Sequence, residues 1–272
     1  MQPVVDLPEF PPQARSARRP PAGNPLTLRD GHLELRLAES RADTADAQRL
    51  RYDVFHRELR LGLASSRSCG LDEDAHDAHC DHLLVIDTAR DCLVGTYRLL
   101  PFHRVPSFGF YSESEFDLAN VKRSGLRLLE LGRSCVAQEY RDGRVILLLF
   151  QGIAEYLRRC DADALMGCAS IHGLETESLA ALQDLLLLRF LTGPELRVTP
   201  RRGFEIPPLP AAAIVDEAAT FRDLPPLFKG YLRMGARVCG PPAYDRQFGT
   251  TDFFLLARAG DIAERYSRHL RG

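Results

Sequence analysis

The 272-residue chain has no tryptophan, no C-x-x-C pair and no apolar run long enough to cross a bilayer. Its seven cysteines are scattered and odd in number, which argues against a zinc site or a disulfide framework and favours a reducing compartment. The 35 Lys+Arg nearly cancel the 37 Asp+Glu, so the chain has no general attraction to nucleic acid. The N-terminus carries no apolar signal core. We therefore expect a cytoplasmic protein that binds neither metal nor nucleic acid.

What the chain has in excess at its start is proline. Seven of the 18 prolines lie in the first 25 residues, beside a basic cluster of Arg15, Arg18 and Arg19. Such a segment buries too little apolar surface to fold, so residues 1–29 are predicted to be a disordered arm. A solvated tail and a peripheral contact with anionic lipid at the inner membrane are both open. Residues 30–272 are expected to form one domain.

Hydrophobic periodicity predicts an alternation of strands and helices in that domain. Strands are expected at 33–38, 82–87, 93–101, 126–136, 162–170 and 248–258, and helices at 44–59, 145–160, 177–191 and 261–270. Asp43 or Thr44 is a candidate N-cap of the first helix, and residues 88–92 are a hairpin turn. This order indicates an α/β fold, a mixed β-sheet flanked by helices with a C-terminal elaboration.

The predicted strand at 126–136 contains charged residues between apolar ones. Glu130 and Arg133 lie in the middle of "LLELGRSCV", where burying either group unpaired is costly. They are therefore a structural ion pair or part of an active site. In an ideal strand Glu130, Gly132 and Ser134 share one face and Arg133 points to the other. Pairing of Glu130 with Arg133 thus requires a β-bulge, for which Gly132 is suited.

Several segments, taken in order, resemble known proteins. "RYDVF", "DEDAHD", "VGTYRLLP" and "ELGRSCV" resemble the acyl-homoserine-lactone synthases and, more closely, the ornithine-lipid N-acyltransferases, two groups with the Gcn5-related N-acetyltransferase (GNAT) fold. "GCAS" and "PPLFKGYLRMGARVCGPPAYDRQFGTTDFF" also resemble the second group. The tryptophan and the "SRF" ending of the synthases are absent. The resemblance covers roughly residues 30 to 260.

The resemblance implies a GNAT-like fold and an acyl transfer without a bound cofactor. The donor would be a (3-hydroxy)fatty acyl group on the phosphopantetheine of acyl carrier protein, and the acceptor the α-amino group of L-ornithine, by direct aminolysis of the thioester. Three alternatives stay open: an N-acyl amino-acid synthase using glycine, lysine or tyrosine, a homoserine-lactone synthase, and an acyl-carrier or lipid-binding module without catalysis.

The same resemblance implies catalytic roles on the strand at 126–136. An amine at neutral pH is mostly protonated, so a base must accept its proton, and Glu130 is the candidate. Arg133 would orient Glu130 or the aspartates, or contact the substrate. Backbone N–H groups from Ser134 to Val136 would stabilise the oxyanion. Ser134 is not expected to be a nucleophile, because "GRSCV" is not G-x-S-x-G.

Five further residues match substrate-site positions of the synthases: Arg51, Phe55, Asp74, Asp77 and Arg98. Carboxylates of the aspartates suit a cationic side chain, and an arginine suits the carboxylate of an amino acid. The alternative is that these residues form an ion-pair cluster that orders the N-terminal part. Both interpretations stay open.

Donor binding is expected at two places. Arg141, Gly143 and Arg144 precede the helix at 145–160, where N–H groups at the helix N-terminus bind the phosphate of the pantetheine arm beside Val136. Lys229, Arg233 and Arg237 recur at helical spacing over 227–237, which predicts either an ordinary amphipathic helix or a basic stripe that binds the acidic carrier protein.

Overall fold

The computed structural model describes residues 25–61, 69–173, 176–209 and 216–262. The chain divides into two compact units, one of residues up to 107 with 129–162, and one of 108–128 with residues from 163 onward. Most of the predicted basic arm and of the predicted C-terminal helix lies outside the described residues. One boundary is wrong: residues 27–29 belong to strand β1, because they pair with β2. A single domain over 30–272 stays a prediction.

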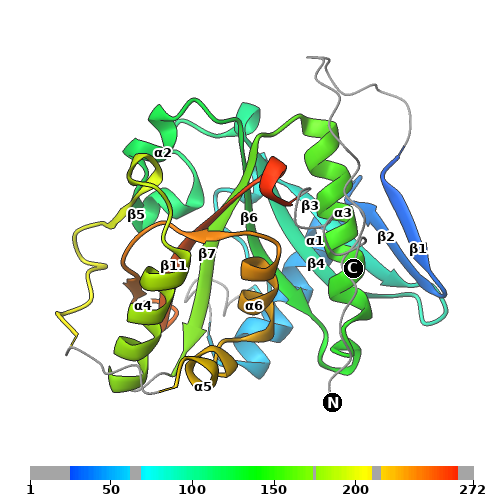
Figure 1. Ribbon diagram of the computed structural model, residues 1–272. Helices are drawn as coiled ribbons and strands as arrows, with labels where there is room; N and C mark the ends of the chain where they lie inside the picture. Colours follow the sequence, from blue (N-terminus) through cyan, green and yellow to red (C-terminus); the bar gives the residue numbers. More distant parts are fainter. Residues whose placement is uncertain (1–24, 62–68, 174–175, 210–215, 263–272) are drawn as a thin grey trace, which may run out of the picture. The chain divides into compact units, whose positions relative to one another are not determined.

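The first unit contains an antiparallel sheet of the order β1-β2-β3-β4-β6. Its strands are β1 (Thr27–Asp30), β2 (Leu33–Leu37), β3 (Asp81–Asp87), β4 (Cys92–Pro101) and β6 (Leu128–Val136). The predicted hairpin is confirmed, since β3 pairs with β4 and the Asp87 carboxylate accepts hydrogen bonds from the turn amides of Ala89 and Arg90. Helix α3 (Arg144–Cys160) lies in front of this sheet and α1 (Arg41–Tyr52) behind it (Figure 1). Helices therefore flank both faces, as predicted.

Helix α1 begins one turn earlier than predicted. Its N-cap is Ser40, whose hydroxyl accepts from the Asp43 amide at 3.1 Å while the Asp43 carboxylate accepts from the Ser40 amide at 3.1 Å. This reciprocal capping box stabilises the first turn, so the predicted cap at Asp43 or Thr44 is wrong. The helix continues into a π-helical segment, Asp53–Glu58, in which Phe55 lies.

Helix α3 packs close to the sheet through two glycines. A Cβ atom on Gly152 would lie 2.7 Å from Leu35 Cδ1 of β2, and one on Gly95 of β4 would clash with Val145 of the helix. Leu35 is fully buried, so it has no room to withdraw. The absence of a side chain at both positions therefore sets the separation between helix and sheet.

The second unit is built on β7 (Ala164–His172) and β11 (Thr250–Arg258), which pair antiparallel along their whole length. Strands β9 (Arg237–Val238) and β10 (Ala243–Asp245) also pair with β11, and β5 (Phe116–Asp117) pairs with β8 (Thr199–Pro200). The helices are α2 (Ala119–Arg123), α4 (Thr176–Phe190), α5 (Glu217–Arg222) and α6 (Pro226–Arg233). Single 3₁₀ turns complete both units: Asp77–His79, Phe102–Arg104, Tyr111–Ser114, Gln138–Tyr140 and Pro194–Leu196.

The predicted basic helix over 227–237 is too long. Helix α6 ends at Arg233, Met234 is its C-cap, and Gly235 takes a left-handed conformation with φ 102°. Arg237 opens strand β9. A glycine in this conformation terminates a helix, so Lys229, Arg233 and Arg237 do not form one helical stripe.

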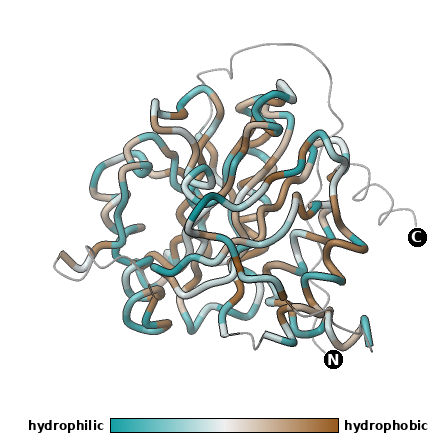
Figure 2. The backbone as a smooth tube through the Cα atoms, turned by 90° about the vertical axis from the view of Figure 1, so that its left-hand side faces the viewer, coloured by the Kyte–Doolittle hydropathy of each residue, from teal (hydrophilic) through white to brown (hydrophobic). Residues whose placement is uncertain are grey.

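Hydrophobic stretches of the backbone are repeatedly interrupted by hydrophilic residues (Figure 2). Within the part of the chain that the structure describes, no helix combines the length and the apolar character that crossing a bilayer requires.

Candidate active site

Strand β6 carries the predicted bulge. Along β4, Thr96 and Arg98 are two residues apart, whereas their partners Cys135 and Gly132 on β6 are three apart, so β6 holds one additional residue. The left-handed conformation falls on Arg133, with φ 51°, and not on Gly132. A non-glycine residue in this region is strained and persists only where its surroundings hold it.

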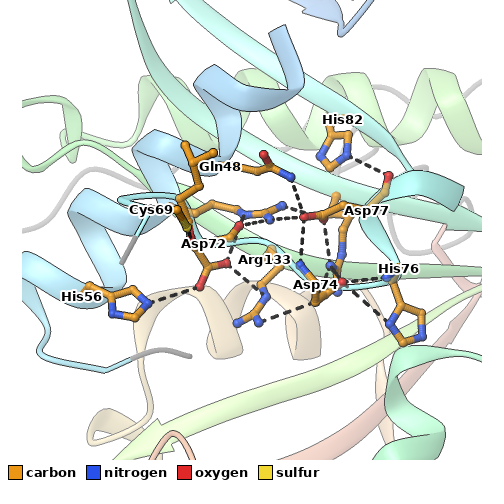
Figure 3. A network of polar contacts seen from close by, with 12 residues as sticks. Gln48, His56, Cys69, Asp72, Asp74, His76, Asp77, His82 and Arg133 are labelled. Carbon is orange, nitrogen blue, oxygen red and sulfur yellow. Dashed lines mark hydrogen bonds and ion pairs between the residues drawn. The ribbon is translucent and has the colours of Figure 1, made fainter. Parts of the chain in front are cut away.

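Arg133 is held by its side chain (Figure 3). Its Nε lies 3.5 Å from Asp72 Oδ1 and one of its terminal nitrogens 3.6 Å from Asp74 Oδ2. The guanidinium carbon stands 5.9 Å from the centre of the Phe55 ring, a cation–π distance. The bulge thus directs the Arg133 side chain toward Asp72 and Asp74, in the loop before β3, and the Phe55 ring lies beside its guanidinium group.

Glu130 lies on the same strand, buried to 5 % exposure and opposite Leu100 of β4. Burial raises the pKa of the nearby Cys80 thiol to about 12, with Arg98 opposing and the carboxylates of Asp77 and Glu130 adding to the effect. Glu130 therefore lies in the electrostatic neighbourhood of the arginine–aspartate cluster. Ser134 follows the bulge and is half-buried on β6.

Two buried aspartates, Asp72 and Asp77, the partly exposed Asp74 and three arginines form the cluster beside β6, in the first unit. Arg51, fully buried in α1, donates to Asp77 Oδ1 at 3.0 Å and to Asp77 Oδ2 at 2.6 Å. Arg98 of β4 donates to Asp74 Oδ2 at 2.7 Å and to Asp77 Oδ1 at 3.0 Å. Asp72, which is fully buried, pairs with Arg51 Nε at 3.2 Å. The positive and negative charges are matched.

The electrostatics of the cluster follow from this matching. Burial tends to raise the pKa of Asp77, but its hydrogen bonds and charge contacts with Arg51 and Arg98 outweigh burial and hold that pKa well below its usual range. Burial tends to raise the pKa of Asp74, but the charge and the hydrogen bonds of Arg98, together with the charge of Arg133, lower it. Burial tends to lower the pKa of Arg98, and Asp74 and Asp77 raise it above its usual value. Asp74, Asp77 and Arg98 therefore stay charged at neutral pH.

The structure brings together every substrate-site residue predicted in the first unit. It also adds Asp72, Gln48 and His56, which the sequence interpretation missed. Gln48 Nε2 donates to Asp77 Oδ2 at 3.0 Å, and His56 Nε2 lies 3.8 Å from Asp72 Oδ2. The spacing of three aspartates in "LDEDAHD" was the available signal for Asp72.

The predicted phosphate-binding arginines are engaged with carboxylates. Arg141 donates to Glu58 Oε2 at 2.8 Å and to the carbonyl oxygen of Val136 at 3.0 Å. Arg144 Nε donates to Asp30 Oδ2 at 3.0 Å. Gly143 is the N-cap of α3 in a left-handed conformation, with φ 103°. The side chains of Arg141 and Arg144 keep 40 % and 43 % of their surface exposed.

The other predicted donor-binding residues lie in the second unit. Lys229 Nζ donates to the carbonyl oxygen of Arg222 at 2.9 Å, and Arg237 donates to the carbonyl oxygen of Arg189 at 3.5 Å. Arg233 and Arg237 are exposed. Because Arg237 belongs to β9, these cations lie on two elements instead of one helix face.

Comparison with known proteins places the chain in a family. A family model described as an acetyltransferase (GNAT) domain matches residues 50–151, which include the arginine–aspartate cluster and β6. An L-ornithine N(alpha)-acyltransferase from Brucella abortus is 41 % identical over 249 residues, 88 % of each chain. One of that name from Agrobacterium fabrum is 38 % identical, over 90 % of this chain and 87 % of its own. The chain belongs to this acyltransferase family.

The family relationship confirms the GNAT-like fold and the resemblance seen in the sequence motifs. Among solved structures, FeeM, an N-acyl amino acid synthase from uncultured soil microbes, superposes with a TM-score of 0.52 at 10 % identity, over 86 % of this chain and 93 % of its own. A likeness at that identity bears on the fold alone. The protein is an acyltransferase with the GNAT architecture.

Proposed function

We propose that this acyltransferase transfers a fatty acyl group, typically 3-hydroxylated, from the phosphopantetheine thioester of acyl carrier protein to the α-amino group of L-ornithine. The observation that carries the proposal is a buried Glu130, three residues before a β-bulge, within an acyltransferase whose relatives are named for this acceptor. A buried carboxylate on the bulged strand meets the need of an aminolysis reaction for a base.

The reaction begins with the removal of a proton from the acceptor. Free α-amino groups titrate near ~8, so most ornithine carries an ammonium that is not nucleophilic. Glu130 accepts the proton, directly or through one water, and the amine attacks the thioester carbonyl. A C–N bond forms, the C–S bond breaks, and the thiolate is released and protonated. The products are an N-acyl-ornithine and the free carrier thiol.

The bulge supports the tetrahedral intermediate. An additional residue at Arg133 interrupts the regular ladder between β4 and β6, and backbone N–H groups between Ser134 and Val136 stabilise the oxyanion. Arg133 acts as a positioning residue, because its contacts with Asp72 and Asp74 hold the left-handed turn that shapes this backbone. The arginine–aspartate cluster gives the bulge a rigid support.

Donor binding is assigned to two groups of cations. Arg141, Gly143 and Arg144 at the N-terminus of α3 bind the phosphate of the pantetheine arm, for which the exposed parts of both guanidinium groups are available. Lys229, Arg233 and Arg237 attract the acidic carrier protein. Arg15, Arg18 and Arg19 attract anionic lipid at the inner membrane surface, where the lipid product accumulates.

The test of the proposal is the variant Glu130→Gln. Purified protein is mixed with 3-hydroxyacyl carrier protein and a panel of amino acids, thiol release is followed, and products are weighed by mass spectrometry. We expect ornithine-dependent release that falls by about 10²–10⁴-fold in kcat in Glu130→Gln, because the amide cannot accept a proton. Glu139→Gln, at a carboxylate 81 % exposed on the same unit, is the matched control and should keep wild-type activity.

Three outcomes would contradict the proposal. Near-full activity in Glu130→Gln removes Glu130 as the base. Release with glycine, lysine or tyrosine but not with ornithine keeps the reaction and replaces the acceptor. No release with any amine from a folded protein removes the transfer itself.

A further inference from the structure

A cavity in the second unit is lined by two arginines. It has a volume of about 260 Å³ and lies between α2 and the segment that leads into β8. Its polar lining consists of Asp117, Asn120, Arg123, Arg197 and Thr199. All five belong to the second unit, whereas the arginine–aspartate cluster belongs to the first, so this cavity is separate from the site described above. We call it the α2–β8 pocket.

The two arginines have no carboxylate partner within the described parts of the chain. The preceding residue of α2, Lys122, forms an ion pair with Glu113 at 2.7 Å. Arg123 and Arg197 form no such pair among the described residues, not even with Asp117, which lines the same pocket. Their positive charges therefore add in one small cavity, which attracts an anion.

Asn120 fixes the position of both arginines. Its side-chain amide donates to the carbonyl oxygen of Arg197 at 2.8 Å, and its amide oxygen accepts from the Arg123 guanidinium. Arg197 Nε donates to the carbonyl oxygen of Thr192 at 3.4 Å. A guanidinium has five N–H donors, so both terminal nitrogens of Arg197 keep theirs for a ligand. Two such nitrogens bind a carboxylate through two parallel hydrogen bonds.

The pocket also contains one acid. Asp117 ends β5, opposite Thr199 of β8. Its Oδ1 accepts from the Ala119 amide at 2.9 Å, and its Oδ2 faces no donor among the described residues. The pocket thus offers two positive charges and one negative charge. A ligand that matches all three has two negative charges and one positive charge.

We propose that the α2–β8 pocket binds a small acidic amino acid, which carries two carboxylates and one ammonium. The carboxylates pair with Arg123 and Arg197, and the ammonium pairs with Asp117. A volume of about 260 Å³ lies just below the range of about 300–1,000 Å³ found for drug-sized ligands, which suits a ligand of this size. A bare phosphate would engage the arginines but would place a second negative charge beside Asp117.

The first test is isothermal titration calorimetry of the full chain at low ionic strength, without an acyl donor. The probes are L-glutamate and glutarate, which share a carbon skeleton and two carboxylates and differ in the ammonium. We expect glutamate to bind, and Arg123→Gln and Arg197→Gln each to weaken its binding at least about 10-fold, because each removes charge-assisted hydrogen bonds. Arg246→Gln removes an exposed positive charge of the same unit outside the pocket, and this control should change the Kd less than about 2-fold.

The variant Asp117→Asn tests the role of the acid by the sign of its effects. The asparagine oxygen can still accept from the Ala119 amide, so the turn before α2 is kept. We expect weaker binding of glutamate, because its ammonium loses a counter-charge. Glutarate should bind more tightly than in the wild type, because a negative charge has been removed from its site.

Four outcomes would overturn the inference. No binding of glutamate at millimolar concentration removes the site. Binding that is unchanged in Arg123→Gln and Arg197→Gln places glutamate elsewhere on the protein. Equal weakening by Arg246→Gln assigns the binding to net charge. Glutarate or inorganic phosphate that binds the wild type as tightly as glutamate does removes the proposed ligand class. Because no acyl donor is present, none of these results depends on the proposed function.

Discussion

At the scale of single residues, Asp77 links several members of the arginine–aspartate cluster of the first unit. Its two oxygens accept from Arg51, Arg98 and Gln48, and it is exposed by 7 %. Removing one member of a buried ion pair is more destructive than replacing the whole set, because the remaining charges lose their compensation without regaining water. Loss of Asp77 should therefore lower the stability of the protein by more than the energies of its hydrogen bonds to Arg51 and Arg98.

Asp77→Asn should lower the free energy of unfolding by about 3–5 kcal/mol, since it leaves part of the positive charge of Arg51 and Arg98 buried and unmatched. The control is Asp46→Asn, at an ion pair with Arg49 whose side chains are both more than half exposed, for which we expect a change of about 1 kcal/mol or less. Urea unfolding followed by circular dichroism measures both. Equal effects of the two substitutions would refute a structural role of the cluster.

At the scale of the elements, helix α3 and the sheet of the first unit approach each other through glycine. The Cβ position of Gly152 is crowded by both methyl groups of Leu35 and by Leu83 Cδ1 at 3.3 Å. Alanine usually stabilises a helix interior over glycine by about 1 kcal/mol. Here the fully buried leucines oppose that gain, because an additional methyl in a close-packed core forces side chains from their rotamers.

Gly152→Ala should therefore destabilise the protein by about 1–2 kcal/mol net, where an exposed helix would be stabilised. Shortening the neighbour by Leu35→Val should reduce the cost of the alanine, which a double-mutant cycle detects as coupling between the two positions. Gly260→Ala is the control, because a Cβ there would meet no atom within 4 Å. A stabilising Gly152→Ala would show that α3 is less tightly packed than the coordinates indicate.

At the scale of the whole molecule, the arginine–aspartate cluster and a second group of buried acids, Glu115, Asp245 and Asp252, respond to pH in opposite directions. The pKa values of Asp74 and Asp77 are lowered by their arginines, so the stability they contribute is present above pH ~3.9 and is lost as the pH falls through their folded values. The pKa of Glu115 is raised from 4.5 to about 9, mainly by burial. Its contribution is complete below pH 4.5 and is lost as the pH rises toward about 9.

Thermal unfolding measured from about pH 5 to about pH 9 tests the predicted loss of the Glu115 contribution as the pH rises. The wild type should lose stability across this range, because unfolding lets Glu115 release its proton in water, away from its buried site and from the charges of Asp252 and Asp245. Glu115→Gln should flatten the slope, as glutamine keeps a hydrogen-bond donor and cannot titrate. A slope unaffected by Glu115→Gln would assign the pH dependence to other groups.

The sequence by itself determined the order of the main elements, the β3–β4 hairpin and the presence of charged residues inside β6. Each of these depends on local information: alternation of apolar residues, turn residues between strands, and charges inside an apolar strand. The family could also be recognised from short motifs in a set order. A bulge was expected because Glu130 and Arg133 point to opposite faces of an ideal strand and could pair only if an additional residue intervened. The N-cap at Ser40 and the end of α6 at Arg233 were missed because local competition between caps and glycines decides them.

The tertiary structure alone decided which charges meet. It placed the left-handed residue at Arg133 and not at Gly132, and assigned Asp74 and Asp77 to arginines of α1 and β4. It also brought Glu115 to Asp245 and Asp252, more than a hundred residues along the chain. No spacing rule links such positions, because strand pairing between distant segments, and not local periodicity, determines which buried carboxylates meet arginines and which meet other carboxylates.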